Sequence, residues 1–230
     1  GLSLCHHVYR GNVGDVDELS PALQRITAML DRNQIPRNSV TLVFDKGTAA
    51  LTNTIELDQA GIGWVSALPW NQAPLSLRDK PVDQLTLCSS QQPGVRATAE
   101  TLLVHGKPYL CVLKYSSSFA SEQLHSLTTS LTKAMQALRR LSLELGKPKA
   151  RWTEPQLRTK IKSLLSAQHL EELVRYQLQE QAGRWKLQFD LDTAAWQRLL
   201  DRRLGRTVLI TNRMDWTAEQ VVNGYSDQQQ

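Results

Sequence analysis

The segment Val40 to Gly47, with the sequence V-T-L-V-F-D-K-G, constrains the fold of this chain more than any other stretch. Its apolar side chains fall at both odd and even positions, which is typical of a strand covered on both faces in a parallel α/β sheet. Asp45 follows at the carboxyl end, where α/β folds place ligands and metals. The sequence Asp-Lys-Gly also suits a plain turn, because it favours local hydrogen bonds and positive φ. A binding site and a simple turn therefore both remain possible for Asp45.

The segments around this strand alternate between strands and helices. Residues 2–10 and 62–68 have the apolar runs of strands, and residues 15–31 and 48–60 have apolar side chains at helical spacing. The first 70 residues therefore predict strand, helix, strand, helix, strand. This βαβαβ order is typical of an α/β fold with a parallel sheet.

A different architecture is predicted after Pro69. Residues 69–96 are rich in Pro, Ser and Gln and predict an irregular excursion, and residues 101–115 predict a β-hairpin. Leucines and one alanine then recur at steps of three and four from Leu124 to Leu145, which predicts a long helix with a heptad seam. A second helix is expected over residues 154–181. Because it follows at once, we expect an antiparallel helical hairpin with a basic outer face and a seam packed within the chain.

The end of the chain returns to alternating elements. A strand is predicted over residues 185–190, a short helix over 193–203 and another strand over 207–212. Thr217-Ala-Glu-Gln220 has the capping-box pattern that begins a helix. The chain begins without Met and ends within this helix, so we expect it to be a segment of a longer protein.

The positive charge of the chain is concentrated in its second half. The net charge is +5, but residues 1–100 hold 8 Lys/Arg and 10 Asp/Glu, whereas residues 101–230 hold 19 and 12. Residues 133–175 alone contain 10 basic and 4 acidic side chains. Such a block fits a surface that faces a polyanion, and it fits a solvated helix face equally well. The candidate DNA-binding residues in this block are Arg139, Arg140, Lys147, Lys149 and Arg151, with Trp152 able to stack on an unpaired base.

Several classes of protein are disfavoured by the composition. Cys5, Cys88 and Cys111 are far apart and include no C-x-x-C pair, which argues against a disulfide framework or a zinc site and favours the cytoplasm. No stretch approaches the roughly 18 apolar residues of a membrane span, so no membrane association is expected. There is no P-loop, no G-x-S-x-G and no H-E-x-x-H, and Gly61-x-Gly63 lacks the third glycine of a dinucleotide fingerprint.

Three stretches, taken together and in order, resemble the DDE transposases of bacterial insertion sequences, in the branch with the Y-R-E-K signature. The first is Y-R-G-N-V-G-D (9–15), which includes Gly11, Asn12 and Asp15. The second is V-F-D-K-G (43–47), which ends at Gly47, and the third is L-I-T-N (209–212) followed by T-A-E-Q-V-V-N-G-Y (217–225). The resemblance spans essentially the whole chain. Its specificity comes from the order and spacing of motifs that are each short.

The resemblance implies an α/β fold with an RNase H-like βαβαβ core that a mixed, largely helical insertion domain interrupts. The first part of the core would comprise residues 1–68, the insertion 69–205 and the return to the core 206–230. Asp45 would be the second metal-binding acid of the catalytic triad, with Lys46 beside it at the DNA. Tyr225 would be the signature tyrosine near the DNA backbone. The signature arginine would fall at position 228, where this chain has Gln228 instead, which weakens any phosphate clamp there.

The resemblance also implies the chemistry and the partners. DDE transposases cut and join phosphodiester bonds by in-line displacement with two Mg²⁺ or Mn²⁺ ions about 4 Å apart, which need carboxylate ligands. The partners would be double-stranded DNA, at the element ends and the target, and a second copy in an active homodimer. The first catalytic Asp would lie upstream of Gly1 and the catalytic Glu two residues beyond Gln230. Since one carboxylate cannot hold two ions, we expect the 230-residue chain alone to be inactive.

Two other functions remain open. An RNase H-like nuclease would keep the fold and change the substrate, although the Y-R-G-N motif and the large insertion argue against it. A non-enzymatic protein would be a degenerate transposase remnant, or a basic DNA-binding or oligomerisation module on an inert α/β base.

Overall fold

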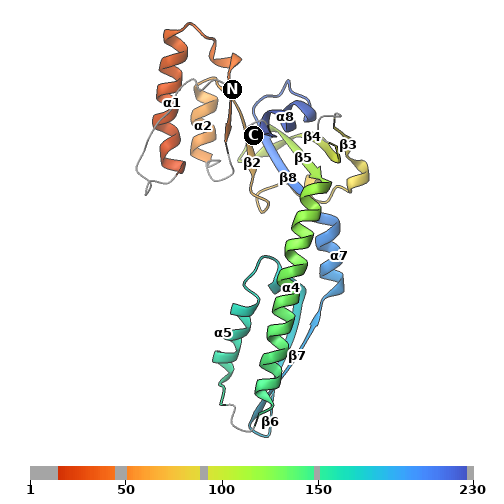
Figure 1. Cartoon of the computed structure of the whole chain (residues 1–230). Coiled ribbons are helices and arrows are strands. Elements are labelled where there is room, and N and C mark those ends of the chain that lie inside the picture. The colour runs from red at the N-terminus through yellow and green to blue at the C-terminus, as the bar shows by residue number, and fades with distance from the viewer. Residues whose placement is uncertain (1–14, 45–50, 89–92, 148–150, 227–230) are drawn as a thin grey trace. The chain divides into compact units, whose positions relative to one another are not determined.

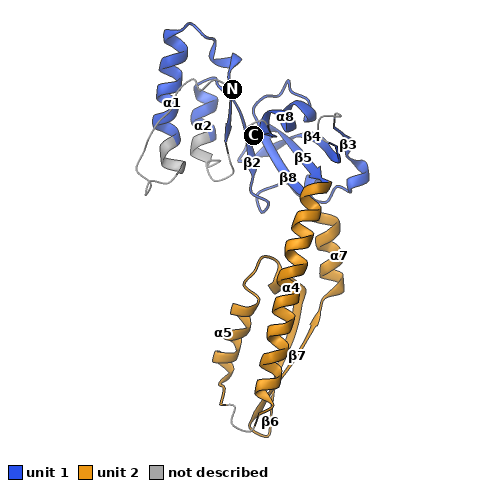
Figure 2. Ribbon diagram, in the orientation of Figure 1, with its two compact units in different colours: residues 1–116, 206–230 blue, residues 117–205 orange. Residues whose placement is uncertain are grey.

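The computed structural model describes residues 15–44, 51–88, 93–147 and 151–226. The chain forms two compact units (Figure 2): unit 1 comprises residues 1–116 and 206–230, and unit 2 comprises residues 117–205. Unit 1 is a mixed α/β unit built on a six-stranded sheet. The strand predicted over residues 2–10 lies outside the described part of the chain.

The sheet of unit 1 is mixed, and the parallel pairing predicted for the βαβαβ segment is confirmed for its two described strands, β1 and β2. Its strand order is β1-β2-β8-β5-β4-β3; β1 and β2 are parallel, and every other neighbouring pair is antiparallel. The predicted hairpin is one of the antiparallel pairs: His105 and Gly106 both have positive φ and form the tight loop that joins β4 to β5. The strands are β1 (Thr41–Phe44), β2 (Gly63–Leu68), β3 (Thr86–Leu87), β4 (Val95–Val104), β5 (Lys107–Ser116) and β8 (Arg206–Thr211).

Helices cover both faces of this sheet, as the apolar pattern of residues 40–44 predicts. Phe44 and Trp64 pack on one face with residues of α1 (Asp15–Arg32) and α2 (Leu51–Gln59). Val43 and Val65 pack on the other face with α8 (Ala218–Ser226). The predicted helices at 15–31 and 48–60 and the strands at 40–45, 62–68 and 207–212 are therefore confirmed, with ends shifted by a few residues. Unit 1 also contains η1 (Arg37–Ser39), α3 (Leu75–Arg78) and η2 (Val82–Gln84).

The inserted unit begins later than predicted. The expected start was residue 69, but the β4–β5 hairpin belongs to the sheet of unit 1, because β5 pairs along six residues with β8. Unit 2 therefore starts at Ser117, and it ends at Gly205, as expected. The excursion over residues 69–96 contains short helical turns and β3, and strand β4 already starts at Val95.

Unit 2 is organised around its long helix α4 (Ser117–Leu145), with α5 (Glu154–Leu164) returning beside it (Figure 1). Five positions of the predicted seam are buried: Leu127, Ala134, Leu138, Leu141 and Leu145. They pack in one core with residues of α5, of strand β7 (Arg184–Leu191) and of α7 (Thr193–Arg202). The prediction that the seam packs within the chain is confirmed.

The second predicted helix, over residues 154–181, is wrong in its second half. Helix α5 ends at Leu164, and after the short α6 (Leu170–Leu173) the chain forms β6 (Val174–Gln181), which pairs antiparallel with β7. Apolar side chains alternate with polar ones along β6, which is the strand period. Ala182 and Gly183, both at positive φ, close the two-residue turn that joins β6 to β7. The strand expected over 185–190 and the helix over 193–203 are confirmed.

The buried seam predicts how unit 2 responds to truncation. Leu138 is fully buried, whereas Leu143 on the same helix is 74% exposed. We expect Leu138→Ala to lower the free energy of unfolding by about 2–5 kcal/mol, since it leaves a cavity in the core. Leu143→Ala, the matched control, should change it by less than about 0.5 kcal/mol. Urea denaturation followed by circular dichroism measures both, and equal effects would show that the seam is not the core of unit 2.

Candidate functional site

The strand directions of unit 1 define one edge of its sheet as the candidate site. Strands β1, β2 and β5 run in the same direction and β8 runs against them. The carboxyl ends of β1, β2 and β5 and the amino end of β8 therefore lie along the same border of the sheet, the one that is formed by strand ends and not by an outer strand. We call this border the carboxyl edge. Phe44 is the last described residue of β1, and Asp45 follows it in the sequence. Ligands of α/β sheets bind at this kind of edge.

Several predicted site residues lie outside the described part of the chain. These are Asp45, Lys46 and Gly47 of the second motif, Gly11 and Asn12 of the first motif, and Lys149 of the basic block. The remaining residue of the first motif, Asp15, is the first residue of α1, so this motif does lead into a helix.

Helix α8 begins with the predicted capping box. The amide of Thr217 donates to Oε1 of Gln220 at 2.8 Å, and the amide of Gln220 donates to Oγ1 of Thr217 at 3.2 Å. Val221 and Val222 are completely buried against the sheet. The helix is thus fixed both at its first turn and along its apolar side.

The last turn of α8 is tied to the carboxyl edge. Nζ of Lys114 donates to Oγ of Ser226 at 3.2 Å. Lys114 lies near the carboxyl end of β5, paired with Thr207 at the start of β8. The end of α8 and the end of β1 are therefore directed to the same edge of the sheet.

Lys114 is a residue of this site that sequence reasoning missed. Burial lowers the pKa of its amine, and the nearby thiol of Cys88 acts in the opposite direction. The sequence Y-L-C-V-L-K-Y contains the signal, because a lysine directly follows a run of buried strand residues. The lysine presents a cation at the edge where α8 ends.

The signature tyrosine has a packing role in this structure. The side chain of Tyr225 is 8% exposed and belongs to the core between α8 and the sheet, with Val65, Val112 and Leu209. Its contact with the DNA backbone stays a prediction of the resemblance.

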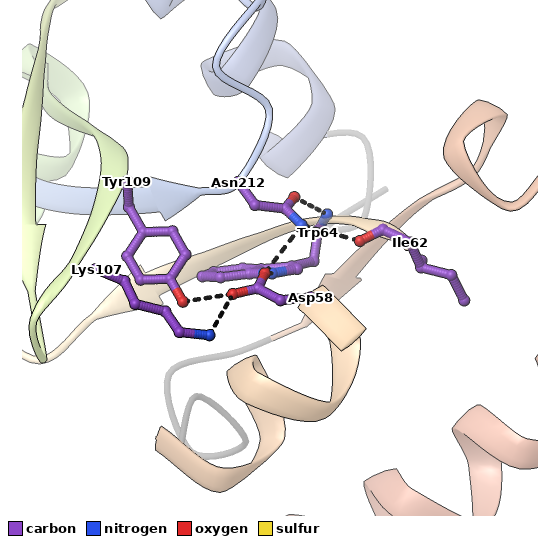
Figure 3. Close-up of polar contacts among 6 residues, drawn as sticks. All are labelled: Asp58, Ile62, Trp64, Lys107, Tyr109 and Asn212. Atoms are coloured by element: carbon purple, nitrogen blue, oxygen red, sulfur yellow. Dashed lines mark hydrogen bonds and ion pairs between the residues drawn. The ribbon is translucent and has the colours of Figure 1, made fainter. Parts of the chain in front are cut away.

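At the opposite edge of the sheet, the carboxylate of Asp58 accepts four hydrogen bonds or ion pairs (Figure 3). Oδ1 accepts from Nε1 of Trp64 at 2.9 Å and from Nδ2 of Asn212 at 3.1 Å. Oδ2 accepts from the hydroxyl of Tyr109 at 2.7 Å and from Nζ of Lys107 at 3.4 Å. Because both of its oxygens already accept from these four donors, this carboxylate stabilises the fold and is not free to bind a metal.

The Asp58 cluster joins segments that are far apart in the sequence. Asn212 also accepts from the amide of Trp64 at 2.9 Å and donates to the carbonyl of Ile62 at 3.0 Å. The cluster therefore connects the end of α2, the start of β2, the start of β5 and the residue after β8. Neither Asp58 nor Asn212 was predicted to have this role, although Asn212 closes the L-I-T-N motif.

A second connection links the same edge to the start of β1. The guanidinium of Arg213 donates to the carbonyl of Val40 at 2.8 Å and to Oγ1 of Thr41 at 3.0 Å. It passes so close to Gly63 that a Cβ there would clash with Nε of Arg213. The glycine leaves room for this side chain, which a larger residue at position 63 would displace.

In unit 2, the described side chains of the basic block are mostly solvent-exposed. Arg139, Arg140, Lys147 and Arg151 are exposed, whereas Trp152 is half-buried against the core of the unit. Helix α5 adds exposed basic side chains, of which Arg158 pairs with Glu154 at 2.7 Å. Unit 2 holds 15 Lys/Arg and 9 Asp/Glu, whereas the rest of the chain holds 12 and 13. All of the net positive charge therefore resides in unit 2.

The described residues contain no complete metal site. Within residues 15–44, 51–88, 93–147 and 151–226, no three His, Cys, Asp or Glu side chains are grouped to hold a metal ion. The two Mg²⁺ ions that the resemblance implies would need carboxylates in addition to Asp45. The side chains described at the carboxyl edge thus do not form this centre by themselves.

Comparisons of the chain with family models, with curated proteins and with solved structures gave no match. In the part of the chain that the structure describes, no helix combines the length and the apolar character needed to cross a membrane.

The Asp58 cluster predicts a specific dependence of stability on alkaline pH. The pKa of Tyr109 lies above its ordinary value, because the ring is buried and its hydroxyl donates to Asp58. A raised pKa stabilises the fold below the unfolded value of about 10, and this contribution is lost as the pH rises further. We expect Tyr109→Phe to lower the free energy of unfolding by about 1 kcal/mol at pH 8. Between about pH 10 and 11 the variant should lose less stability than the wild type, because it has no phenol to ionise at this position. Urea midpoints at these pH values measure it. An unchanged alkaline loss of stability in Tyr109→Phe would contradict the assignment.

The tie between Lys114 and Ser226 predicts the dynamics of the last turn of α8. We expect Lys114→Met to keep the packing of the lysine stem and to accelerate amide exchange at residues 223–226 about fivefold, the equivalent of one hydrogen bond of about 1 kcal/mol. Hydrogen–deuterium exchange with mass spectrometry measures this rate. Lys133→Met on α4 is the control, and no change in α8 for Lys114→Met would mean that the hydrogen bond does not hold the helix end.

Proposed function

We propose that this chain is the catalytic-core and insertion segment of a DDE transposase, an enzyme that cuts and joins DNA at the ends of a mobile element. The observation that carries this proposal is the convergence of two segments at the carboxyl edge. Strand β1 ends at Phe44, directly before Asp45, and the last turn of α8 is bonded to the same edge through Lys114. In the family that the sequence resembles, one catalytic acid follows such a strand and another follows such a helix.

The position of the insertion also supports the proposal. Unit 2 lies in the sequence between β5 and β8, which are neighbours in the sheet. The core can therefore be an RNase H-like sheet that an independent unit interrupts, as the resemblance implies. An RNase H-like core is a more specific description than a mixed six-stranded sheet. This part of the proposal rests on the motifs at 43–47 and 209–225.

The charge distribution agrees with DNA as the partner. Unit 2 carries 15 basic and 9 acidic residues, and exposed arginines and lysines make most phosphate contacts in DNA complexes. In this proposal unit 2 holds the DNA, unit 1 supplies the scaffold, and Asp45 supplies one carboxylate to the reaction centre.

A non-enzymatic DNA-binding module is the second candidate. It is favoured by the same basic surface, which does not depend on any catalytic acid. The two functions agree on DNA binding and differ on cleavage, so cleavage is the property to measure.

The test is a plasmid-nicking assay with Mg²⁺, on protein expressed from coding sequence that extends past both ends of these 230 residues. The extension is needed because the resemblance places the other two acids there. We expect Asp45→Asn to lower the cleavage rate by roughly three orders of magnitude or more, as for other catalytic groups. Asp83→Asn, an exposed acid of η2, should have no effect.

DNA binding in EDTA should be the same for the wild type and for Asp45→Asn, which separates binding from chemistry. Cleavage that survives Asp45→Asn would refute the role of this acid. Binding without cleavage in the wild type would favour the non-enzymatic module.

A further inference from the structure

The two-stranded ribbon of unit 2 has two chemically different faces. Apolar side chains of β6 and β7 turn inward to the core of unit 2: Val174, Tyr176, Leu178, Trp185, Leu187, Phe189 and Leu191. On the β7 side, Oγ of Ser142 in α4 donates to the carbonyl of Leu187 at 3.2 Å. The inner face is thus committed to packing, and the alternate residues of both strands form an exposed outer face.

The outer face is a double row of hydrogen-bonding side chains. Gln177 pairs across the strands with Gln188, Gln179 with Lys186, and Gln181 with Arg184. At the base of the ribbon, Arg175 forms an ion pair with Asp190 at 2.6 Å, which neutralises the only acid of these rows. Within the described residues, the side chains of Gln177, Gln179, Lys186 and Gln188 are exposed and make no hydrogen bond or ion pair. Their donors and acceptors are available to a partner.

We propose that this outer face enters the major groove of duplex DNA and reads base edges. This inference deepens the proposed function and rests on it for the choice of DNA as the partner. Unit 1 would then hold the reaction centre, and the ribbon would select the sequence on which the enzyme acts.

The dimensions of the ribbon fit the groove. Eight residues in each strand give a length of about 27 Å. The major groove of B-DNA is about 12 Å wide and admits a two-stranded β-ribbon. The tight turn at Ala182-Gly183 keeps the tip narrow, because only two residues lie between the paired Gln181 and Arg184.

The side-chain chemistry fits base recognition. A glutamine amide offers a donor and an acceptor together, which match N7 and the N6 amino group of adenine, and Arg and Lys match the two acceptors of guanine. Three glutamines around Lys186 therefore favour adenines close to a guanine. An RNA duplex is a poorer partner, because its major groove is too deep and narrow for side chains to read.

The experiment is an in vitro selection with the full 230-residue chain, from a library of random-sequence DNA duplexes, in EDTA so that cleavage plays no part. The test variant is Gln177→Ala/Gln179→Ala/Gln188→Ala. Its matched control, Gln136→Ala/Gln168→Ala/Gln197→Ala, removes three exposed glutamines of unit 2 that lie outside the ribbon. Thermal unfolding midpoints establish that both variants fold.

The wild type and the control should select the same motif. The ribbon variant should still bind DNA, but its preference for the selected site over random duplex should fall by roughly 5- to 150-fold for each base that its side chains no longer recognise. The slope of affinity against salt concentration should not change, because phosphate contacts set it.

Three results would overturn the inference: a wild type that selects no motif, a ribbon variant that selects the same motif with the same preference, or equal binding to an RNA duplex. None of them depends on the cleavage assay with Asp45→Asn. A failure of the ribbon and a failure of the proposed enzymatic function can therefore be told apart.

Discussion

The pairing of β8 with both β2 and β5 is the interaction on which unit 1 depends. Strand β8 comes after the 117–205 insertion and enters the sheet between two strands from the first half of the chain. Without it, the β1–β2 pair and the β5–β4–β3 group would have no ladder in common. The entropy cost of closing such a long connection rises only slowly with its length, and a connection that folds into its own core reduces this cost further.

The Asp58 cluster adds polar specificity to this pairing. Its carboxylate gathers donors from β2, from β5 and from the residue after β8, so it is satisfied only when all three strands are in register. A half-buried carboxylate without these partners would bear the cost of its own desolvation. The cluster thus penalises alternative registers more than it adds to the strength of the correct one.

The sequence predicted those elements whose signal is local and periodic. The helix at 15–31, the strand at 40–45 and the seam from Leu124 to Leu145, of which Leu124 itself is exposed, were found because apolar spacing alone specifies them. Strand β6 was missed because Leu, Glu, Gln and Arg are good helix formers, and pairing with β7 overrides that preference. Asp45 and Tyr225 came from short motifs. The Asp58 cluster and the Lys114–Ser226 hydrogen bond could not be predicted, since all of their contacts except that of Asp58 with Trp64 join residues 49 to 154 positions apart, which only the folded sheet brings together.

The register at the ends of the insertion makes the two units modular. Tyr115 near the end of β5 and Arg206 at the start of β8 are paired directly across the sheet. Cα atoms in such a pair are about 5 Å apart. For the pairing of β5 with β8, the whole of unit 2 therefore takes the place of the loop of a β-hairpin. An inserted unit can be removed, enlarged or exchanged at this point while the core strands keep their register. The surface of unit 2, including the outer face of its ribbon, can therefore change in sequence while the strands of unit 1 keep their pairing.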